Sequence, residues 1–302
     1  MKLLLTGAFA YSDSQIEKIK SLGFDVLFHR DERAKIPFDV SDVDAVVCNG
    51  LFLYNPIEDF KSLKFIQLTS AGLDRAPLGY IKLHGIKLFN ASGVYSAPMA
   101  EFALCGVLQI MKQSRFFYNN QRAHKWEKHR GLTELSGKTV LIVGAGSVGK
   151  ETAKLFGAFG TKVLGVDLKS FDSEYFDEIY PVEEIDSVIP KADIVVLTLP
   201  LNADNAHFFN MEKFSLMKNS AVFVNIARGG LVNTEDLISA LKREDIASAV
   251  LDVFEEEPLP ENSPLWDMEN VIITPHNSFV GDNNNQKMFG VIYKNLKGLK
   301  ND

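Results

Sequence analysis

A glycine-rich segment, Gly144-Ala145-Gly146-Ser147-Val148-Gly149, follows an apolar run at 140–143 and precedes a helical pattern at 150–159. The first glycine permits a tight turn, the second lets the backbone approach a pyrophosphate, and the third lets the helix pack on the strand. The N-terminus of that helix stabilises the phosphates. With a strand before it and a helix after it, this spacing predicts a dinucleotide-binding loop in which Gly144, Gly146 and Gly149 lie against the cofactor.

A carboxylate closes the next strand pattern. Asp167 lies 18 residues after Gly149, where its side chain can accept hydrogen bonds from both hydroxyls of the cofactor's adenosine ribose. A carboxylate there repels a 2′-phosphate, so we expect NAD rather than NADP. Lys169, two residues further on, is a cation that could bind the 2′-phosphate, so NADP remains an alternative.

Three polar side chains follow three later strand patterns. They are Arg228, Glu257 and His276, and each comes shortly after its apolar run ends. Open α/β sheets bind ligands at the carboxyl ends of their strands, and neighbouring strands lie only about 4.8 Å apart. If the three strands are neighbours, these side chains converge on one ligand.

The chemistry of such a group beside a nicotinamide is the reduction of a 2-oxo acid. Arg228 offers a planar fork that binds a carboxylate and polarises the neighbouring carbonyl. His276 can give a proton to the nascent hydroxyl or take it back, and Glu257 would stabilise the imidazolium. Asp252, at the end of the fifth strand pattern at 248–253, can accept a hydrogen bond from the nicotinamide carboxamide. Taken singly, each residue also has a non-catalytic interpretation. Arg228 would be a surface arginine, Glu257 part of a solvated acidic turn, and His276 a structural histidine.

The other five histidines lie in segments typical of a protein surface. We predict no role for them: His29, His84, His124, His129 and His207.

The segment that holds these residues alternates strand and helix patterns. Six apolar runs predict strands, at 138–143, 163–166, 194–199, 221–226, 248–253 and 271–274, with helical patterns such as 211–217 and 234–242 between them. Continuously apolar strands indicate a parallel sheet covered on both faces. We therefore expect a doubly wound sheet.

The first hundred residues predict a smaller α/β unit. Its strand patterns lie at 3–6, 25–28, 45–48, 65–68 and 87–89, and Ser14-Gln15-Ile16-Glu17 has the spacing of a capping box that opens a helix. Pro98 opens a helix over 99–112 that is apolar nearly all round, as expected of a helix buried between domains or subunits. The tail from Asp282 predicts an amphipathic helix.

Composition excludes several classes of protein. A chain of 302 residues suggests about two domains, and its net charge of −7 without a long Lys/Arg run argues against nucleic acid as a partner. Cys48 and Cys105 lie in apolar runs, which favours buried, reduced thiols and excludes a metal cluster. The longest apolar stretch, 102–111, is about half a membrane span, and 1–10 fits a buried strand better than a signal peptide. We expect a cytoplasmic protein with no metal and no membrane contact.

Four segments together resemble the D-isomer-specific 2-hydroxyacid dehydrogenase family. They are the glycine segment at 144–149, Asn-Ile-Ala-Arg-Gly-Gly-Leu-Val at 225–232, Leu-Asp-Val-Phe-Glu-Glu-Glu-Pro-Leu at 251–259 and Thr-Pro-His at 274–276. A fifth, 90–104, is similar to the segment where that family enters its cofactor domain. The resemblance implies a catalytic set of Arg228, Glu257 and His276.

The same resemblance implies the fold and the binding residues. A Rossmann NAD-binding domain at 99–279 would be inserted into a flavodoxin-like substrate-binding domain at 1–98 plus 280–302, and the enzyme would be a homodimer. The implied substrate contacts come from Ser70, Ala71 and Gly72 together with Arg228. The implied cofactor contacts include Ser147, Val148, Asp167, Ile226, Ala227 and Asp252.

Two segments depart from the family pattern. After His276 the family usually has small residues, whereas Asn277-Ser278-Phe279-Val280 follows here. In the loop at 49–54, phosphoglycerate-using relatives carry arginine, and this chain has Asn-Gly-Leu-Phe-Leu-Tyr. We therefore expect an oxo acid with a short or apolar side chain rather than a phosphate.

Two other functions remain open on the same fold. One is an NAD(H)-sensing, corepressor-like binding module, against which the intact Arg228, Glu257 and His276 argue. The other is a formate-type dehydrogenase, which is disfavoured because Glu257 would place a negative charge beside a small anion.

Overall fold

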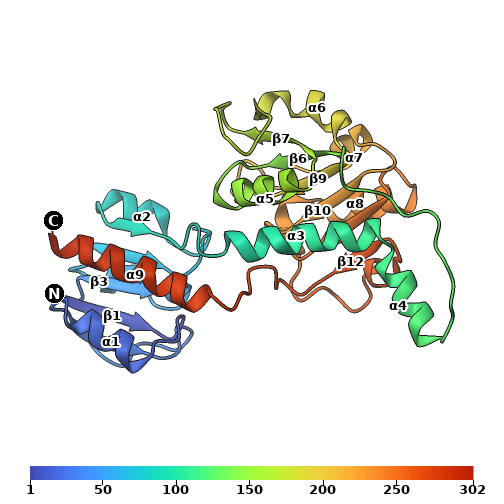
Figure 1. Ribbon diagram of the computed structural model, residues 1–302. Coiled ribbons are helices and arrows are strands. Elements are labelled where there is room, and N and C mark those ends of the chain that lie inside the picture. The colour runs from blue at the N-terminus through green and yellow to red at the C-terminus, as the bar shows by residue number, and fades with distance from the viewer. Residues whose placement is uncertain (302) are drawn as a thin grey trace. The chain divides into compact units, whose positions relative to one another are not determined.

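The computed structural model describes residues 1–301, and the chain divides into two compact units (Figure 1). Unit 1 comprises Met1–Tyr95 together with the C-terminal segment from Gly281, and unit 2 is Ser96–Val280. Within residues 1–301, none of the helices combines the length and the apolar character that crossing a membrane requires.

Unit 1 is built on a five-stranded parallel sheet in the order β2-β1-β3-β4-β5. Its strands are β1 (Lys2–Thr6), β2 (Asp25–His29), β3 (Ala45–Cys48), β4 (Phe65–Leu68) and β5 (Lys87–Phe89). Its helices are α1 (Asp13–Lys20), α2 (Leu78–Leu83) and α9 (Asn284–Asn301), with short 3-10 turns η1 (Leu51–Leu53) and η2 (Ile57–Asp59). This strand order is flavodoxin-like, with a topological switch between β1 and β3.

The C-terminal helix α9 belongs to unit 1 because its apolar stripe completes that unit's core. Met288, Ile292 and Leu296 are buried in one cluster with Leu3 and Leu5 of β1. Their spacing of four places them on one helical face, so the tail returns to the sheet that the first residues began.

The start of α1 lies two residues before the predicted one. Ser12 is the N-cap: its hydroxyl accepts from the Gln15 N–H at 3.3 Å, and the Gln15 side chain accepts from the Ser12 N–H at 2.9 Å. A capping box is present, but it uses Ser12 instead of Ser14. Glutamine at the N3 position lets Ser12 satisfy both donors reciprocally.

Unit 2 is built on a seven-stranded parallel sheet in the order β12-β11-β10-β9-β6-β7-β8. The strands are β6 (Thr139–Val143), β7 (Lys162–Asp167), β8 (Glu178–Pro181), β9 (Ile194–Leu197), β10 (Val222–Asn225), β11 (Ser248–Leu251) and β12 (Val271–Ile273). This is the Rossmann order extended by one strand. The two doubly wound, parallel-sheet α/β domains predicted from the sequence are confirmed. Strand β8 was not predicted, because a four-residue, half-exposed edge strand ending in proline has no continuous apolar run.

Helices cover both faces of this sheet (Figure 1). They are α3 (Ser96–Met111), α4 (Ser114–Arg122), α5 (Ser147–Ala158), α6 (Ile185–Val188), α7 (Met211–Leu216) and α8 (Thr234–Lys242), with 3-10 turns η3 (Val182–Glu184), η4 (Ile189–Lys191), η5 (Gly229–Leu231) and η6 (Pro264–Asp267). Helix α3 lies close to β11, since a Cβ on Gly106 would be only 2.5 Å from Val250 Cγ1.

Two burial expectations are wrong. Cys105 is exposed although its run is apolar, because it lies on the face of α3 that also carries Glu101 and Gln109. His29 is buried, at 8% exposure, because it ends the half-buried strand β2 and its ring nitrogen Nε2 lies 3.1 Å from the Ala34 carbonyl.

A segment of unit 2, residues 114–134, leaves the sheet as an arm (Figure 1). It contains α4, which has no buried residue, and a stretch without regular structure after it. Arg115 anchors its base by donating to the carbonyls of Met268 and Val271 at 3.0 and 2.9 Å. Trp126, in the middle of the arm, is fully exposed.

Candidate active site

The glycine loop connects β6 to α5 at the carboxyl edge of the seven-stranded sheet. Gly144 has φ +102, and a Cβ there would lie 2.7 Å from the Leu199 N atom. A Cβ on Gly149 would lie 2.0 Å from the Gly144 carbonyl oxygen. A Cβ on Gly146, by contrast, would meet no atom within 4 Å. Two glycines are therefore required by the fold, and the third leaves open space in front of the helix N-terminus, which fits a bound pyrophosphate.

Asp167 ends β7, the strand next to β6. Its Oδ2 accepts from the Ala145 N–H at 2.8 Å, and its Oδ1 accepts from the Leu168 N–H at 2.7 Å. An ionised carboxylate has about four acceptor positions, so two remain for ribose hydroxyls. The hydrogen bond to Ala145 holds this carboxylate against the glycine loop.

Arg228 follows β10 on a turn that a buried asparagine fixes. Asn225 is 1% exposed; its Oδ1 accepts from the Ala227 N–H at 3.1 Å, and its Nδ2 donates to the Arg228 carbonyl at 3.0 Å. The guanidinium Nη1 donates to the Ala227 carbonyl at 2.8 Å. The side chains of Ile226 and Ala227 are buried in the hydrophobic clusters, so they can reach a ligand only through their backbone.

The turn that carries Arg228 packs directly on the turn after β11. A Cβ on Gly229 would lie 1.9 Å from the carbonyl carbon of Phe254, so only glycine allows this approach. Phe254 in turn donates its N–H to Glu257 Oε1 at 3.1 Å. This backbone contact holds the arginine beside the acidic turn 255–257.

Glu257 and His276 form a direct pair. The Oε2 atom of Glu257 lies 2.8 Å from the Nδ1 atom of His276, and both side chains are 36% exposed. An ionised carboxylate can only accept, so Nδ1 carries a proton and Nε2 is the nitrogen left for another group. The strands β10, β11 and β12 are neighbours, which brings Arg228, Glu257 and His276 to one sheet edge.

A buried carboxylate holds the turn on which His276 sits. His276 has φ +51, and its N–H donates to the Asp252 carbonyl at 2.7 Å. The side chain of Asp252, 0% exposed, accepts from Thr274 Oγ1 at 2.7 Å, from Asn277 N at 2.8 Å and from Ser278 N at 2.9 Å. This anchoring was not predicted, because a left-handed backbone at a histidine has no marker in the sequence.

A second histidine–carboxylate pair supports the acidic turn. His207 Nε2 contacts Glu255 Oε1, and Glu255 Oε2 accepts from the Thr234 N–H at 2.7 Å. Burial alone would raise the pKa of Glu255, but the hydrogen bonds from Thr234 and His207 outweigh it and lower this pKa below its ordinary value. His207, for which no role was predicted, therefore ties the loop after β9 to the turn that carries Glu257.

The segment Ser70-Ala71-Gly72 follows β4 in unit 1. Ser70 Oγ donates to the Gly72 carbonyl at 2.9 Å, and Asn90 Nδ2 donates to the Ala71 carbonyl at 2.7 Å. Among residues 1–301, the backbone N–H groups of Ala71 and Gly72 donate to no other group. Two such donors in one exposed loop can accept an anion.

The protein-family model described as "D-isomer specific 2-hydroxyacid dehydrogenase, NAD binding domain" matches residues 104–278, more than half of the chain. The chain belongs to the D-isomer-specific 2-hydroxyacid dehydrogenase family. A glyoxylate reductase from Thermofilum pendens is 32% identical over 285 residues, which cover 90% of this chain and 84% of that protein.

Solved structures agree with this membership. A glyoxylate reductase from Paecilomyes thermophila superposes with a TM-score of 0.87 at 25% identity, covering 99% of this chain and 95% of that one. A D-isomer-specific 2-hydroxyacid dehydrogenase from Xanthobacter autotrophicus Py2, solved in complex with NADPH and MES, gives a TM-score of 0.81 at 26% identity and covers 99% and 95%.

Family membership makes this dehydrogenase an oxidoreductase that uses a nicotinamide cofactor and acts on the CH–OH group of 2-hydroxy acids. The residues present fit such a cofactor, since the open space at Gly146 lies at the N-terminus of α5.

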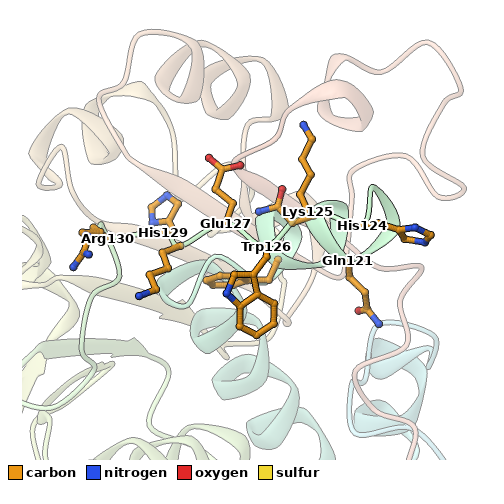
Figure 2. Close-up of a pocket in the computed structure, with 10 residues that line it drawn as sticks. Gln121, His124, Lys125, Trp126, Glu127, His129 and Arg130 are labelled. Atoms are coloured by element: carbon orange, nitrogen blue, oxygen red, sulfur yellow. The ribbon is translucent and has the colours of Figure 1, made fainter.

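A large hollow of this dehydrogenase lies away from the glycine loop. It measures about 810 Å³ and is formed by α4 and the residues that follow it. Figure 2 shows Trp126 among its lining side chains, together with Gln121, Lys125 and Glu127. The hollow is therefore part of the arm and contains none of the predicted site residues.

Proposed function

We propose that this protein is an NAD-dependent dehydrogenase that interconverts a small 2-oxo acid and the corresponding D-2-hydroxy acid. The observation that carries the proposal is the 2.8 Å pair of Glu257 and His276 at the sheet edge where the Arg228 turn also ends. An imidazole held by a carboxylate beside a guanidinium suits a reaction that moves a proton at an oxygen next to a carboxylate.

Each residue has one task in this reaction. When bound, the nicotinamide supplies the hydride that C2 of the oxo acid accepts. The Arg228 guanidinium binds the substrate carboxylate and stabilises negative charge on the C2 oxygen. His276 Nε2–H gives its proton to that oxygen, and Glu257 stabilises the imidazolium before the transfer. In the direction of oxidation, neutral Nε2 takes the hydroxyl proton.

Binding roles follow from the same sheet edge. We assign the pyrophosphate to Gly144, Gly146 and Gly149, with Ser147 and Val148 in the first turn of α5. The backbone at Ile226 and Ala227 would line the nicotinamide side. Asp252 was the predicted acceptor for the nicotinamide carboxamide, but its side chain is 0% exposed and its Oδ atoms already accept three hydrogen bonds, so we assign it the positioning of the His276 turn.

We assign NAD rather than NADP as the preferred cofactor. The carboxylate of Asp167, fixed by Ala145 at 2.8 Å, would face a 2′-phosphate with like charge. Ser70, Ala71 and Gly72 are the proposed contacts for the substrate carboxylate in unit 1, because two of their N–H groups are available as donors.

The proposal is tested by following NADH oxidation with glyoxylate, hydroxypyruvate, pyruvate and branched 2-oxo acids. We expect saturable turnover of at least one of them and a D-configured product by chiral chromatography. Binding of NADH without turnover of any 2-oxo acid would overturn the enzyme assignment.

We further propose a cytoplasmic homodimer whose contact is the arm at 114–134. The arm exposes Phe117, Tyr118 and Trp126, and it carries five Lys or Arg side chains against two Glu side chains in a chain of net charge −7. The remainder of a second copy is therefore acidic and complements it.

Sedimentation velocity tests this contact. We expect a species of twice the 33.6 kDa chain mass that dissociates in a Phe117→Ser/Trp126→Ser variant. A dimer that survives both substitutions would place the contact elsewhere.

A further inference from the structure

The carboxyl edge of the five-stranded sheet holds an internal carboxylate. Glu32 lies after β2, and its Oε1 accepts from Thr6 Oγ1 at 2.6 Å and from the Asn49 N–H at 2.8 Å. Its Oε2 accepts from the Gly50 N–H at 2.7 Å. Thr6 ends β1, and Asn49 and Gly50 follow β3.

This position is the ligand crevice expected of the fold. In a sheet of order 2-1-3-4-5, ligands bind at the carboxyl ends of the strands, at the switch between β1 and β3. Two consecutive backbone N–H groups and a hydroxyl directed at one point form an anion-binding cradle. In this protein the anion is a side chain of the chain itself.

Other polar atoms at the same edge have no partner within the described chain. Asn49 Oδ1 and Tyr11 Oη are both buried without a hydrogen bond. Burial raises the pKa of Tyr11, and the nearby Cys48 and Glu32 add to this effect, which places the phenol near the same carboxylate. Buried polar atoms without partners are unusual, so two of them near Glu32 single out this edge of the sheet.

The cradle adjoins the segment assigned to substrate binding. Strands β3 and β4 pair in register, and the Thr69 N–H donates to the Cys48 carbonyl at 2.8 Å. The loop with Gly50 and the loop with Ser70-Ala71-Gly72 therefore leave neighbouring strands at the same level, about 4.8 Å apart in the sheet.

Arg75, from the segment after β4, lies beside the loop that holds Gly50. A Cβ built on Gly50 would lie 3.8 Å from Glu32 Oε2 and 3.9 Å from Arg75 Cδ. No cation was expected from the 49–54 loop itself, and the stem of the exposed Arg75 side chain lies close to that loop. The negative charge of Glu32 weakens the attraction of this arginine for a second anionic group of a substrate.

We propose that Glu32 is an internal anion that fills the cradle of unit 1 and selects 2-oxo acids without a second anionic group. The selection among 2-oxo acids rests on the proposed dehydrogenase function. The binding of Glu32 in the anion cradle is independent of that function. A carboxylate or phosphate at the far end of a substrate would meet the like charge of Glu32, which offsets the attraction of the nearby Arg75. A neutral side chain meets no such repulsion.

Substrate preference tests the selection. The ratio of kcat/KM for 2-oxoglutarate to that for 2-oxopentanoate compares a dianion with a monoanion of equal chain length. We expect Glu32→Gln, which keeps the shape and removes the charge, to raise this ratio about tenfold, and Glu32→Gln/Arg75→Gln to cancel the gain. Glu58→Gln, an exposed carboxylate of the same unit, should leave it unchanged. An unchanged ratio in Glu32→Gln would overturn the selection.

Thermal unfolding tests the cradle without any substrate. Glu32→Ala should lower Tm by several degrees, and formate should restore part of the loss in a saturable way that chloride at equal ionic strength does not match. The wild-type protein should show no formate effect. Formate and chloride acting equally on Glu32→Ala would refute the cradle, whatever the enzyme assay shows.

Discussion

At the carboxyl edge of the seven-stranded sheet, the loop after β6 leaves open space at Gly146, and the donors at the start of α5 face that space. At the same edge of the five-stranded sheet, the loop after β3 gives its N–H groups to Glu32. Both sheets are parallel and doubly wound, so both have the geometry that binds ligands. The difference is that a side chain from another loop, Glu32 after β2, occupies the backbone donors in unit 1, whereas a Cβ at Gly146 in unit 2 would meet no atom within 4 Å.

The two edges also differ in how carboxylates are used. In unit 2, Glu257 contacts His276 directly and Asp252 accepts from the N–H group of Asn277, the residue after it, and His276 is the residue that we propose as proton carrier. In unit 1, Glu32 accepts from the N–H groups of Asn49 and Gly50, so these two donors are already occupied. Substitutions that remove or neutralise these carboxylates therefore test what each of them does at its sheet edge.

The largest effect is expected at Asp252. In Asp252→Asn, an amide replaces one acceptor oxygen by a donor that faces backbone N–H groups, so the turn with His276 must move. A displacement of about 1 Å can reduce kcat about 10²-fold, and the lost charge-assisted hydrogen bonds should lower the free energy of unfolding by about 2 kcal/mol or more. Steady-state kinetics and denaturant unfolding measure both.

Asp267→Asn is the matched control for this prediction, because Asp267 is an exposed carboxylate of the same unit. If Asp252→Asn kept wild-type kcat, the buried carboxylate would not position His276.

A smaller effect is expected at Asp167. Asp167→Ala removes the negative charge held beside the glycine loop, and we expect the preference for NAD over NADP, as a ratio of kcat/KM values, to fall about tenfold, which corresponds to about 1.4 kcal/mol. Asp172→Ala, an exposed aspartate five residues on, serves as control. An equal fall in both variants would remove Asp167 from the ribose site.

The smallest effect concerns the pH dependence of stability through Glu255. Its pKa is lower in the folded protein than in the unfolded chain, where it is about 4.3. The stabilisation is therefore present above pH 4.3 and is lost as the pH falls through the folded-state pKa. We expect Glu255→Gln to be less stable than wild type at pH 6, by less than about 1 kcal/mol because the side chain is partly exposed, and the gap to close as the pH falls through the folded-state pKa of Glu255.

The neighbouring Glu256, which is exposed, provides the comparison. A gap of the same size for Glu256→Gln, or a gap independent of pH, would mean that the hydrogen bonds from Thr234 and His207 do not stabilise the turn.

Periodicity and motif spacing predicted both parallel sheets and the glycine loop between a strand and a helix, whereas the order of the strands came only from the structure. These features depend on local patterns: apolar runs, glycines with a steric task and the order of elements along the chain. The capping box at Ser12 and the edge strand β8 were misplaced or missed because competing serines and short edge strands have weak patterns.

The supporting contacts could not be predicted for a different reason. Three of these contacts join segments that are far apart in the chain. They link Asp252 to the His276 turn, His207 to Glu255, and Glu32 to Gly50. Such pairs depend on how loops meet at a sheet edge, and a single sequence does not contain that information. The exposure of Cys105 likewise follows from which face of α3 packs on the sheet.

His276→Ala tests most directly whether His276 is the proton carrier of this 2-hydroxyacid dehydrogenase. We measure kcat/KM for the best 2-oxo acid together with the Kd for NADH, with His84→Ala, an exposed histidine of unit 1, as control. We expect kcat/KM to fall about 10³-fold or more, with NADH binding within about twofold of wild type. Turnover retained at the wild-type level with every active oxo acid would contradict this role of His276.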